Sequence, residues 1–429
     1  MKNILLIAIC IFVFLDGLFA QKTYLHCGKI ITAENKKVQS EKTIIVEDNM
    51  IIEILSGYAE PKDTDATVVD LRKQTVMPGL HDMHVHIEHQ SSKKRYEEGF
   101  RLNDADVALK ATIYCKKTLM AGFTSVRDLG GSGVNVSLGN AIAKGHIDGP
   151  RILTCEKAIA TTGGHADPTN GLRKDLLGDP GPKEGVINSP EEARKAVRQR
   201  YKNGADCIKI TATGGVLSVA KDGQGPQFTD EEVSAIVLAA KEYGYVTAAH
   251  AHGAEGMRRA VEAGITTIEH GTKMTEEVMD LMIKKGTYLV PTISAGKYVE
   301  AKAKIPGFFP DIIVPKALEI GPLIQDTFAA AYKRGVKICF GTDAGVFPHG
   351  ENAKEFIYMS EAGMPIIETI ISATRVPAEI MGTIDKLGTL TVGKYADIIA
   401  VEGDPTEDVN TMTQVQFVMK NGLVYKSEF

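Results

Sequence analysis

Four histidines and an aspartate lie within nine residues, 81–89, in the segment PGLHDMHVHIEHQ. The whole chain has 11 histidines in 429 residues, so this segment is strongly enriched in groups that can ligate a metal or move a proton. Successive side chains of a strand alternate faces, so Asp82, His84 and His86 share one face while His81 takes the other. Two imidazoles at this spacing can reach one borderline ion such as zinc. A polar strand end with no ligand role is the alternative.

Groups of the same kind end other short apolar segments: Lys209 in DCIKITATGG, His250 and His252 in AAHAHG, His270 in TTIEHGT, and Asp343 in GTDAG. A lysine in an apolar segment is unusual, because lysine is seldom buried without a partner. Burial lowers an amine's pKa and frees its lone pair, and such an amine can add carbon dioxide to form a carbamate that bridges two cations. An ordinary lysine paired with Asp82 or Asp343 is the alternative.

Eight short apolar segments, each ending in polar or glycine residues, alternate with helical patterns. The segments cover residues 80–86, 123–130, 151–159, 206–213, 245–253, 266–272, 287–294 and 336–344. Helices are predicted at 189–204, where Ser189 caps the start and Gly204 the end, and at 229–244 and 275–286. This alternation predicts an α/β fold of the (β/α)8 TIM-barrel type, whose chemistry lies at the carboxyl ends of the strands.

The two ends of the chain have a different texture, with short β-rich pieces separated by turns. We therefore predict three parts: a signal peptide at 1–20, a small discontinuous β-sandwich domain of 21–77 plus 387–429, and a barrel with the metal-ligating groups at 78–386. The first part combines Lys2 with the apolar run Ile4 to Leu15, which is too short to span a bilayer. It predicts a secreted or periplasmic protein that has no membrane association after cleavage.

Composition excludes several other classes. The net charge of −5 and the lack of a basic stripe predict no nucleic-acid partner and favour a small molecule. Six cysteines without a C-x-x-C spacing predict no disulfide framework. The sequence leaves the oligomeric state open, a homo-oligomer included.

As a set, these segments resemble the amidohydrolase superfamily, specifically its two-metal type with a carbamylated lysine. PGLHDMHVH, GFTSVRDLGG, TTGGHAD, GADCIKITATGG, AAHAHG, AGITTIEHGT, GTDAG and GTLTVGKYADIIAVEGDP are similar to the imidazolonepropionase-related branch that contains metal-dependent Xaa-Pro and Xaa-Arg dipeptidases. The resemblance covers nearly all of the chain after residue 20. One departure is His81, where the pattern usually has an apolar residue.

The resemblance implies two divalent ions, zinc being the first candidate. His84, His86 and Asp343 would hold one ion, His250 and His270 the other, and Lys209, as N6-carboxylysine formed with CO2, would bridge them. His250 is preferred to His252 as ligand because it matches the family position; spacing alone leaves the two interchangeable. A hydroxide between the ions would attack the amide, with Asp343 as base and then acid.

Substrate contacts are predicted at four positions that follow strands: His165, His252, His349 and Asn352. His165 is also the candidate donor to the developing oxyanion. Asp128 and Glu269 are interpreted as salt-bridge partners rather than groups that orient ligands. The predicted function is hydrolysis of dipeptides or N-acyl amino acids; alternatives are a hydrolase of a cyclic amide, lactone or N-acyl xenobiotic, and a non-catalytic scaffold of the same fold.

Overall fold

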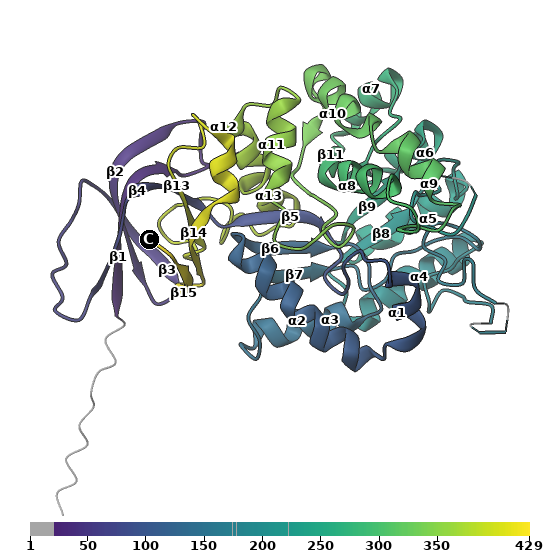
Figure 1. Ribbon diagram of the computed structural model, residues 1–429, viewed down its shortest axis with the longest axis horizontal. Coiled ribbons are helices and arrows are strands. Elements are labelled where there is room, and N and C mark those ends of the chain that lie inside the picture. Colours follow the sequence, from purple (N-terminus) through teal and green to yellow (C-terminus); the bar gives the residue numbers. More distant parts are fainter. Residues whose placement is uncertain (1–20, 174, 177, 222) are drawn as a thin grey trace, which may run out of the picture.

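The computed structural model describes residues 21–173, 175–176, 178–221 and 223–429. The predicted signal peptide, 1–20, lies outside the described residues. Figure 1 shows two regions side by side, a sheet built from both ends of the described chain and a larger region of parallel strands surrounded by helices. Within the described ranges, no helix combines the length and the apolar character needed to cross a membrane.

Strands from both ends of the chain form one seven-stranded sheet, here called the terminal sheet. Its hydrogen-bonded order is β15-β14-β13-β4-β1-β2-β3. The strands are β1 (Lys22–Ile31), β2 (Val38–Glu47), β3 (Met50–Ser56), β4 (Thr67–Pro78), β13 (Ile398–Glu402), β14 (Val415–Lys420) and β15 (Leu423–Ser427). Its apolar core includes Leu25, Ile44 and Phe417, each fully buried. The ladders form one continuous sheet, so the predicted two-sheet sandwich does not appear in them; the division into domains stays a prediction.

All eight apolar segments contain a strand, and together with their helices they form the parallel-strand region. They are β5 (Leu80–Val85), β6 (Phe123–Asp128), β7 (Arg151–Thr154), β8 (Cys207–Thr211), β9 (Val246–Ala251), β10 (Thr267–His270), β11 (Tyr288–Val290) and β12 (Lys337–Ile338). Their ladders give two parallel sheets, β12-β11-β10-β9-β8 and β5-β6-β7. Since the regular ladders do not close into one barrel, the predicted barrel is matched only in part.

Isolated backbone contacts connect the two parallel sheets at both edges. Met83 N donates to Phe340 O at 3.1 Å on one side, and Ile159 N donates to Lys209 O at 2.8 Å on the other. These contacts bring the carboxyl ends of β5 and β8 to the same end of the region.

Thirteen α-helices and one 3-10 helix lie in the described ranges. They are α1 (Arg95–Arg101), α2 (Asp104–Met120), α3 (Val134–Ala143), α4 (Pro190–Asn203), α5 (Asp230–Glu242), α6 (Ala254–Ala263), α7 (Glu276–Lys285), α8 (Ile293–Ala303), α9 (Val314–Ile320), α10 (Leu323–Arg334), α11 (Lys354–Glu361), α12 (Ile366–Ser372), α13 (Arg375–Ile380) and η1 (Val409–Thr413). The predicted caps of α4 are confirmed: the Ser189 side chain accepts from Glu192 N, and Gly204 is left-handed with φ 89°.

Candidate active site

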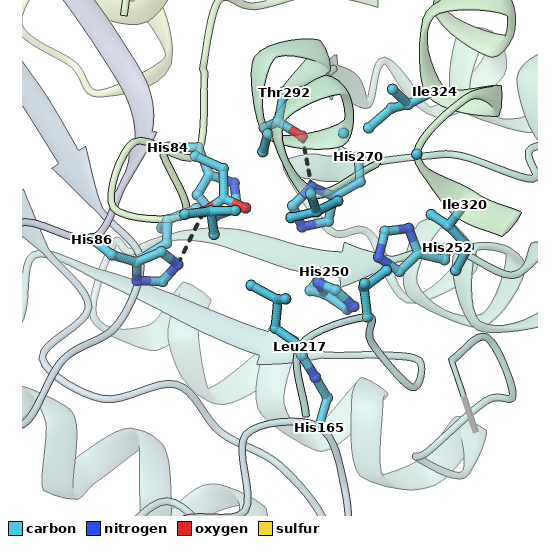
Figure 2. Close-up of a pocket in the computed structure, with 18 of the residues that line it drawn as sticks. His84, His86, His165, Leu217, His250, His252, His270, Thr292, Ile320 and Ile324 are labelled. Atoms are coloured by element: carbon cyan, nitrogen blue, oxygen red, sulfur yellow. Dashed lines mark hydrogen bonds and ion pairs between the residues drawn. The ribbon is translucent and has the colours of Figure 1, made fainter. Parts of the chain in front are cut away.

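A cavity of about 200 Å³ lies at the carboxyl ends of the parallel strands. All six predicted metal ligands and two predicted substrate contacts line it: His84, His86, Lys209, His250, His270, Asp343, His165 and His252. Figure 2 shows the labelled imidazoles converging on one space from β5, β9, β10 and the segment that follows β7. Residues separated by up to 259 positions in the chain therefore meet at one place.

His84, His86 and Asp343 form one side of this centre. Asp343 Oδ1 lies 3.6 Å from His84 Nε2 and 3.4 Å from His86 Nε2. The other ring nitrogen of each histidine is already bonded: His84 Nδ1 donates to Glu269 Oε2 at 2.8 Å, and His86 Nδ1 donates to Gly130 O at 2.8 Å. These bonds fix the tautomer and leave both Nε2 lone pairs directed at the same point.

His250 and His270 form the other side. Their ring centroids are 4.7 Å apart, and those of His84 and His270 are 5.1 Å apart. His250 Nε2 donates to Gly214 O at 3.1 Å, which leaves Nδ1 as its free acceptor, while His270 Nδ1 contacts the Thr292 hydroxyl at 2.7 Å and leaves Nε2. His250 therefore keeps a free lone pair on Nδ1, and His270 keeps one on Nε2 when its Nδ1 donates to the Thr292 hydroxyl.

His252 and His165 flank this second side. His252 stacks on His270 at 5.0 Å, and its Nδ1 contacts the Thr272 hydroxyl at 2.9 Å. The ring of His165 stacks on that of His250 at 4.3 Å. His165 fits there because residue 215 is glycine: a Cβ at that position would lie 2.2 Å from His165 Cε1. Both rings are thus held beside the centre and can face a substrate.

The backbone is strained where these side chains are presented. His270, Thr292 and Asp343 all have positive φ, at 69°, 54° and 62°. Left-handed conformations in non-glycine residues, Thr292 above all, cost free energy and persist only where the surrounding structure imposes them. Three such residues at neighbouring strand ends indicate that the fold imposes the direction of these side chains despite the conformational free energy that it costs.

The charges of Lys209 and Asp343 each affect the pKa of the other residue. Burial lowers the pKa of Lys209, while the carboxylates of Glu269 and Asp343 oppose this effect. Burial raises the pKa of Asp343 to about 7, and the charge of Lys209 opposes this rise. A lowered pKa shifts a lysine toward the neutral amine, which is the form that carbamate formation needs.

The donor set fits divalent ions. Asp343 Oδ1 is buried and has no hydrogen-bond partner among the described residues, although it faces two imidazole lone pairs. One donor atom each from His84, His270 and Asp343 lies within 4.8 Å of the others. Neutral imidazoles with a carboxylate are the ligands that zinc and related ions take in proteins.

The sequence interpretation missed the role of Glu269. This side chain is fully buried, accepts from His84 Nδ1, and pairs with Arg127 Nη2 at 2.9 Å. It therefore does form a salt bridge, but the same carboxylate orients a predicted ligand. The available signal was a pair of opposite charges inside two apolar strand segments, FTSVRDLG and TTIEHGT.

Three other residues lie away from the cavity lining. Asp82 is fully buried, and its oxygens accept from His84 N, Thr342 N, Thr342 Oγ1 and Asn352 Nδ2. Asn352 is thus engaged in supporting β5 and not at a rim. His349 stacks on Tyr114, and its Nε2 donates to His89 O at 2.9 Å. The expected rim position of His349 and Asn352 differs from their buried positions, because both side chains satisfy internal hydrogen bonds.

Comparisons with known proteins identify the family of this chain. The family model described as Amidohydrolase family matches residues 75–424. A solved Xaa-Pro dipeptidase with bound methionine in the active site is 52% identical, covers 95% of this chain and 100% of its own, and superposes with a TM-score of 0.92. A prolidase complexed with N-methylphosphonate-L-proline is 30% identical over 95% and 100% of the two chains, with a TM-score of 0.86.

A curated relative, the ochratoxinase of Aspergillus niger, is 31% identical over 95% of this chain and 87% of its own length. The family match spans far more than half of the chain, and it includes every residue that converges on the cavity. This chain belongs to the amidohydrolase family and is a hydrolase of that family.

Proposed function

We propose that this enzyme hydrolyses the amide bond of dipeptides or N-acyl amino acids with two divalent ions. His84, His86 and Asp343 would hold one ion, His250 and His270 the other, and carbamylated Lys209 would bridge them. The observation that carries the proposal is the convergence of these six side chains on one cavity, where each of the four histidines uses one ring nitrogen in a hydrogen bond and keeps the other for a ligand. When bound, such ions supply a water of lowered pKa and polarise a carbonyl oxygen.

The chain's own groups support the proton transfers. The Asp343 carboxylate is buried at the centre, and its Oδ1 has no hydrogen-bond partner among the described residues. A carboxylate oxygen in this position could take a proton from the attacking water and return it to the leaving nitrogen. Without that return, the tetrahedral intermediate reverts to the amide.

His165 is proposed to stabilise the developing oxyanion. Burial lowers the pKa of His165 to about 3, so the ring is neutral at physiological pH and keeps one N–H. Its Nδ1 is buried without a hydrogen-bond partner in the described part of the chain. A neutral, preoriented N–H costs no reorganisation when charge develops on the substrate oxygen.

The same reasoning supports two finer structural proposals. The contacts Met83–Phe340 and Ile159–Lys209 support a (β/α)8 barrel in which the two parallel sheets are continuous. Export through residues 1–20 is a further proposal, and it depends on the apolar run described above.

The test is hydrolysis by the zinc-loaded protein. Xaa-Pro, Xaa-Arg and Xaa-Lys dipeptides and N-acetyl amino acids are assayed beside lactones, cyclic amides and N-acyl xenobiotics. The relative named ochratoxinase keeps the last class in the panel. We expect turnover of dipeptides or N-acetyl amino acids. Turnover of ring substrates or N-acyl xenobiotics alone contradicts the proposal, and turnover of nothing favours the non-catalytic scaffold.

A further inference from the structure

The amino end of α8 is capped by a carboxylate from another helix. The first backbone N–H groups of a helix have no acceptor within it, and those of α8 begin at Ile293. Glu355 of α11, 62 positions later, supplies the acceptors. Its Oε1 accepts from Ile293 N at 2.7 Å, and its Oε2 accepts from Ser294 N at 2.7 Å and from Ser294 Oγ at 2.6 Å. Glu355 is fully buried, and one helix end satisfies both of its oxygens.

Thr292, the residue before α8, does not cap its own helix. A threonine at this position ordinarily accepts from a backbone N–H two or three residues later. Thr292 makes no such bond, and its hydroxyl instead contacts His270 Nδ1 at 2.7 Å (Figure 2). Because Glu355 satisfies the helix end, the Thr292 hydroxyl stays available to the predicted ligand.

Other helices of the parallel-strand region begin in the ordinary way. In each, a residue with extended backbone precedes the helix and its side chain accepts from the backbone N–H three residues later. These caps are Ser189 for α4, Thr229 for α5 and Thr275 for α7. The start of α8 therefore departs from a pattern that this chain uses elsewhere, and it does so beside the cavity.

The conformation of Thr292 depends on bonds to the backbone around it. Its φ of 54° and ψ of 42° are unfavourable for a β-branched residue. Thr292 N donates to Gly341 O at 3.1 Å, and the next two N–H groups donate to Glu355. If the bonds to Glu355 were lost, the unsatisfied helix end would compete for the Thr292 hydroxyl, and Thr292 could relax to the extended conformation of an ordinary cap.

We infer that Glu355 is a positioning residue for the metal centre: it caps α8, and thereby keeps the Thr292 hydroxyl on His270 Nδ1 and the His270 Nε2 lone pair toward the ion. The inference rests on the proposed function and adds to it a residue that contacts neither an ion nor the substrate. Because His270 and His250 belong to the same side of the centre, the ion on that side is the one affected.

The experiment measures the affinity of both ions by competition with a chelator. Cobalt takes the place of zinc, because it accepts similar ligands and its visible spectrum reports on their geometry. Glu355→Gln leaves one amide oxygen for two N–H groups. Thr292→Val keeps the branched shape and removes the hydroxyl, whereas Thr292→Ser keeps the hydroxyl. The double variant Glu355→Gln with Thr292→Val completes the set.

The matched control lies next to Glu355 on the same helix. Phe356 is fully buried, and its ring packs on Phe340 with centroids 4.5 Å apart. Phe356→Leu should lower Tm through lost packing and leave the affinity of both ions and the cobalt spectrum unchanged. Tm is measured for every variant, so that a loss of stability is separated from a loss of metal binding.

We expect Glu355→Gln and Thr292→Val each to weaken one ion about 10- to 100-fold and to change its cobalt spectrum, with little effect on the other ion. Thr292→Ser should bind both ions like wild type. The double variant should lose no more than the larger single loss, because both changes remove the same support for His270.

Losses that add in the double variant would overturn the inference, because Glu355 would then not act through Thr292. A lower Tm with unchanged affinities in Glu355→Gln would also overturn it. If Glu355→Gln does not fold, Thr292→Val decides, and unchanged affinities there have the same meaning.

Failure of the proposed function has a different signature. Wild type that binds two ions and cleaves no amide removes the proposed function and leaves the role of Glu355 intact. Wild type that binds one ion, weakened by Glu355→Gln, removes only the two-ion centre. Wild type that cleaves amides, with affinities that Glu355→Gln leaves unchanged, removes only the role of Glu355.

Discussion

The terminal sheet and the cavity both contain left-handed residues, and the two regions use them differently. In the terminal sheet, Asp48 and Asn421 have φ values of 53° and 52° and lie in the turns β2–β3 and β14–β15, where such conformations reverse the chain. In the cavity, His270, Thr292 and Asp343 have the same conformation at the ends of parallel strands. Strain in a turn serves the fold, whereas strain at these strand ends directs side chains into a cavity.

Charges differ between the regions in the same way. In the terminal sheet, Arg72 pairs with Asp70 while both side chains stay about half exposed, at 55% and 52%. Such exposed pairs contribute little to stability. In the cavity, Asp343 and Arg95 each keep a buried polar atom without a hydrogen-bond partner among the described residues. Gln74 Oε1 of the terminal sheet is also buried without a partner, but it belongs to a neutral amide, whereas these atoms of Asp343 and Arg95 belong to charged groups.

The largest expected effect comes from Asp343→Asn. The amide keeps the shape of the carboxylate but cannot carry the proton, and it is a poorer ligand, so we expect kcat/KM to fall about 10⁴-fold or more. The matched control in the terminal sheet, Asp70→Asn, removes the exposed partner of Arg72 and should leave kcat/KM unchanged. Comparable losses in both variants would erase the contrast between the two regions.

A smaller effect is expected from Glu269→Gln. The amide oxygen can serve Arg127 or His84 but not both, so one buried charge loses its partner or His84 changes tautomer. We expect metal affinity to fall about 10- to 100-fold, measured by competition with a chelator, together with a lower Tm. Unchanged affinity with a lower Tm would reduce Glu269 to a structural salt bridge.

A substitution of His81 should change the stability of the fold without changing the site. Its expected effect on kcat/KM is the smallest of the three. Burial lowers its pKa to about 4, with the nearby Asp397 opposing and Arg151 adding to the shift. The unfolded chain, with an ordinary pKa near 6.5, binds this proton first as the pH falls. His81 therefore does not lower the free energy of unfolding above pH about 6.5. Between about pH 6.5 and 4 its titration lowers that free energy by on the order of 3 kcal/mol.

His81→Leu removes that loss. The variant should match or exceed wild type in free energy of unfolding at neutral pH, because both ring nitrogens of His81 are buried without hydrogen-bond partners in the described ranges. The difference should widen from pH 6.5 to 4, and kcat/KM at pH 7 should stay near the wild-type value. Parallel stability curves for the two proteins in denaturant titrations at several pH values would contradict this.

The sequence was informative where periodicity and residue type act together. Alternation along 80–86 placed His84 and His86 on one face, and polar strand ends identified Lys209, His250, His270 and Asp343, all of which line the cavity. Local patterns could not reveal which polar side chains would form hydrogen bonds with other residues of the chain and so be unable to bind substrate. Asn352 donates to Asp82, 270 positions away, and no local pattern carries such a pairing.

Two further features needed tertiary structure. Arg95 follows a polar, charged segment that resembles a solvated helix start, and only the folded chain turns its guanidinium into the cavity. The eight strand segments were correctly located, but their shortness, down to the two residues Lys337–Ile338 of β12, leaves the ladders as two sheets. Strand position is encoded locally, whereas pairing at the sheet edges depends on contacts across the whole region.

Metal content per chain is the most direct test of the central claim, that six convergent side chains hold two ions around a carbamylated lysine. Purified protein is stripped of metal and reconstituted with zinc, with and without bicarbonate, and bound metal is counted. The account predicts about two equivalents per chain, a requirement for bicarbonate, and about one equivalent or less in Lys209→Met. One equivalent in wild type, indifferent to bicarbonate, would contradict it.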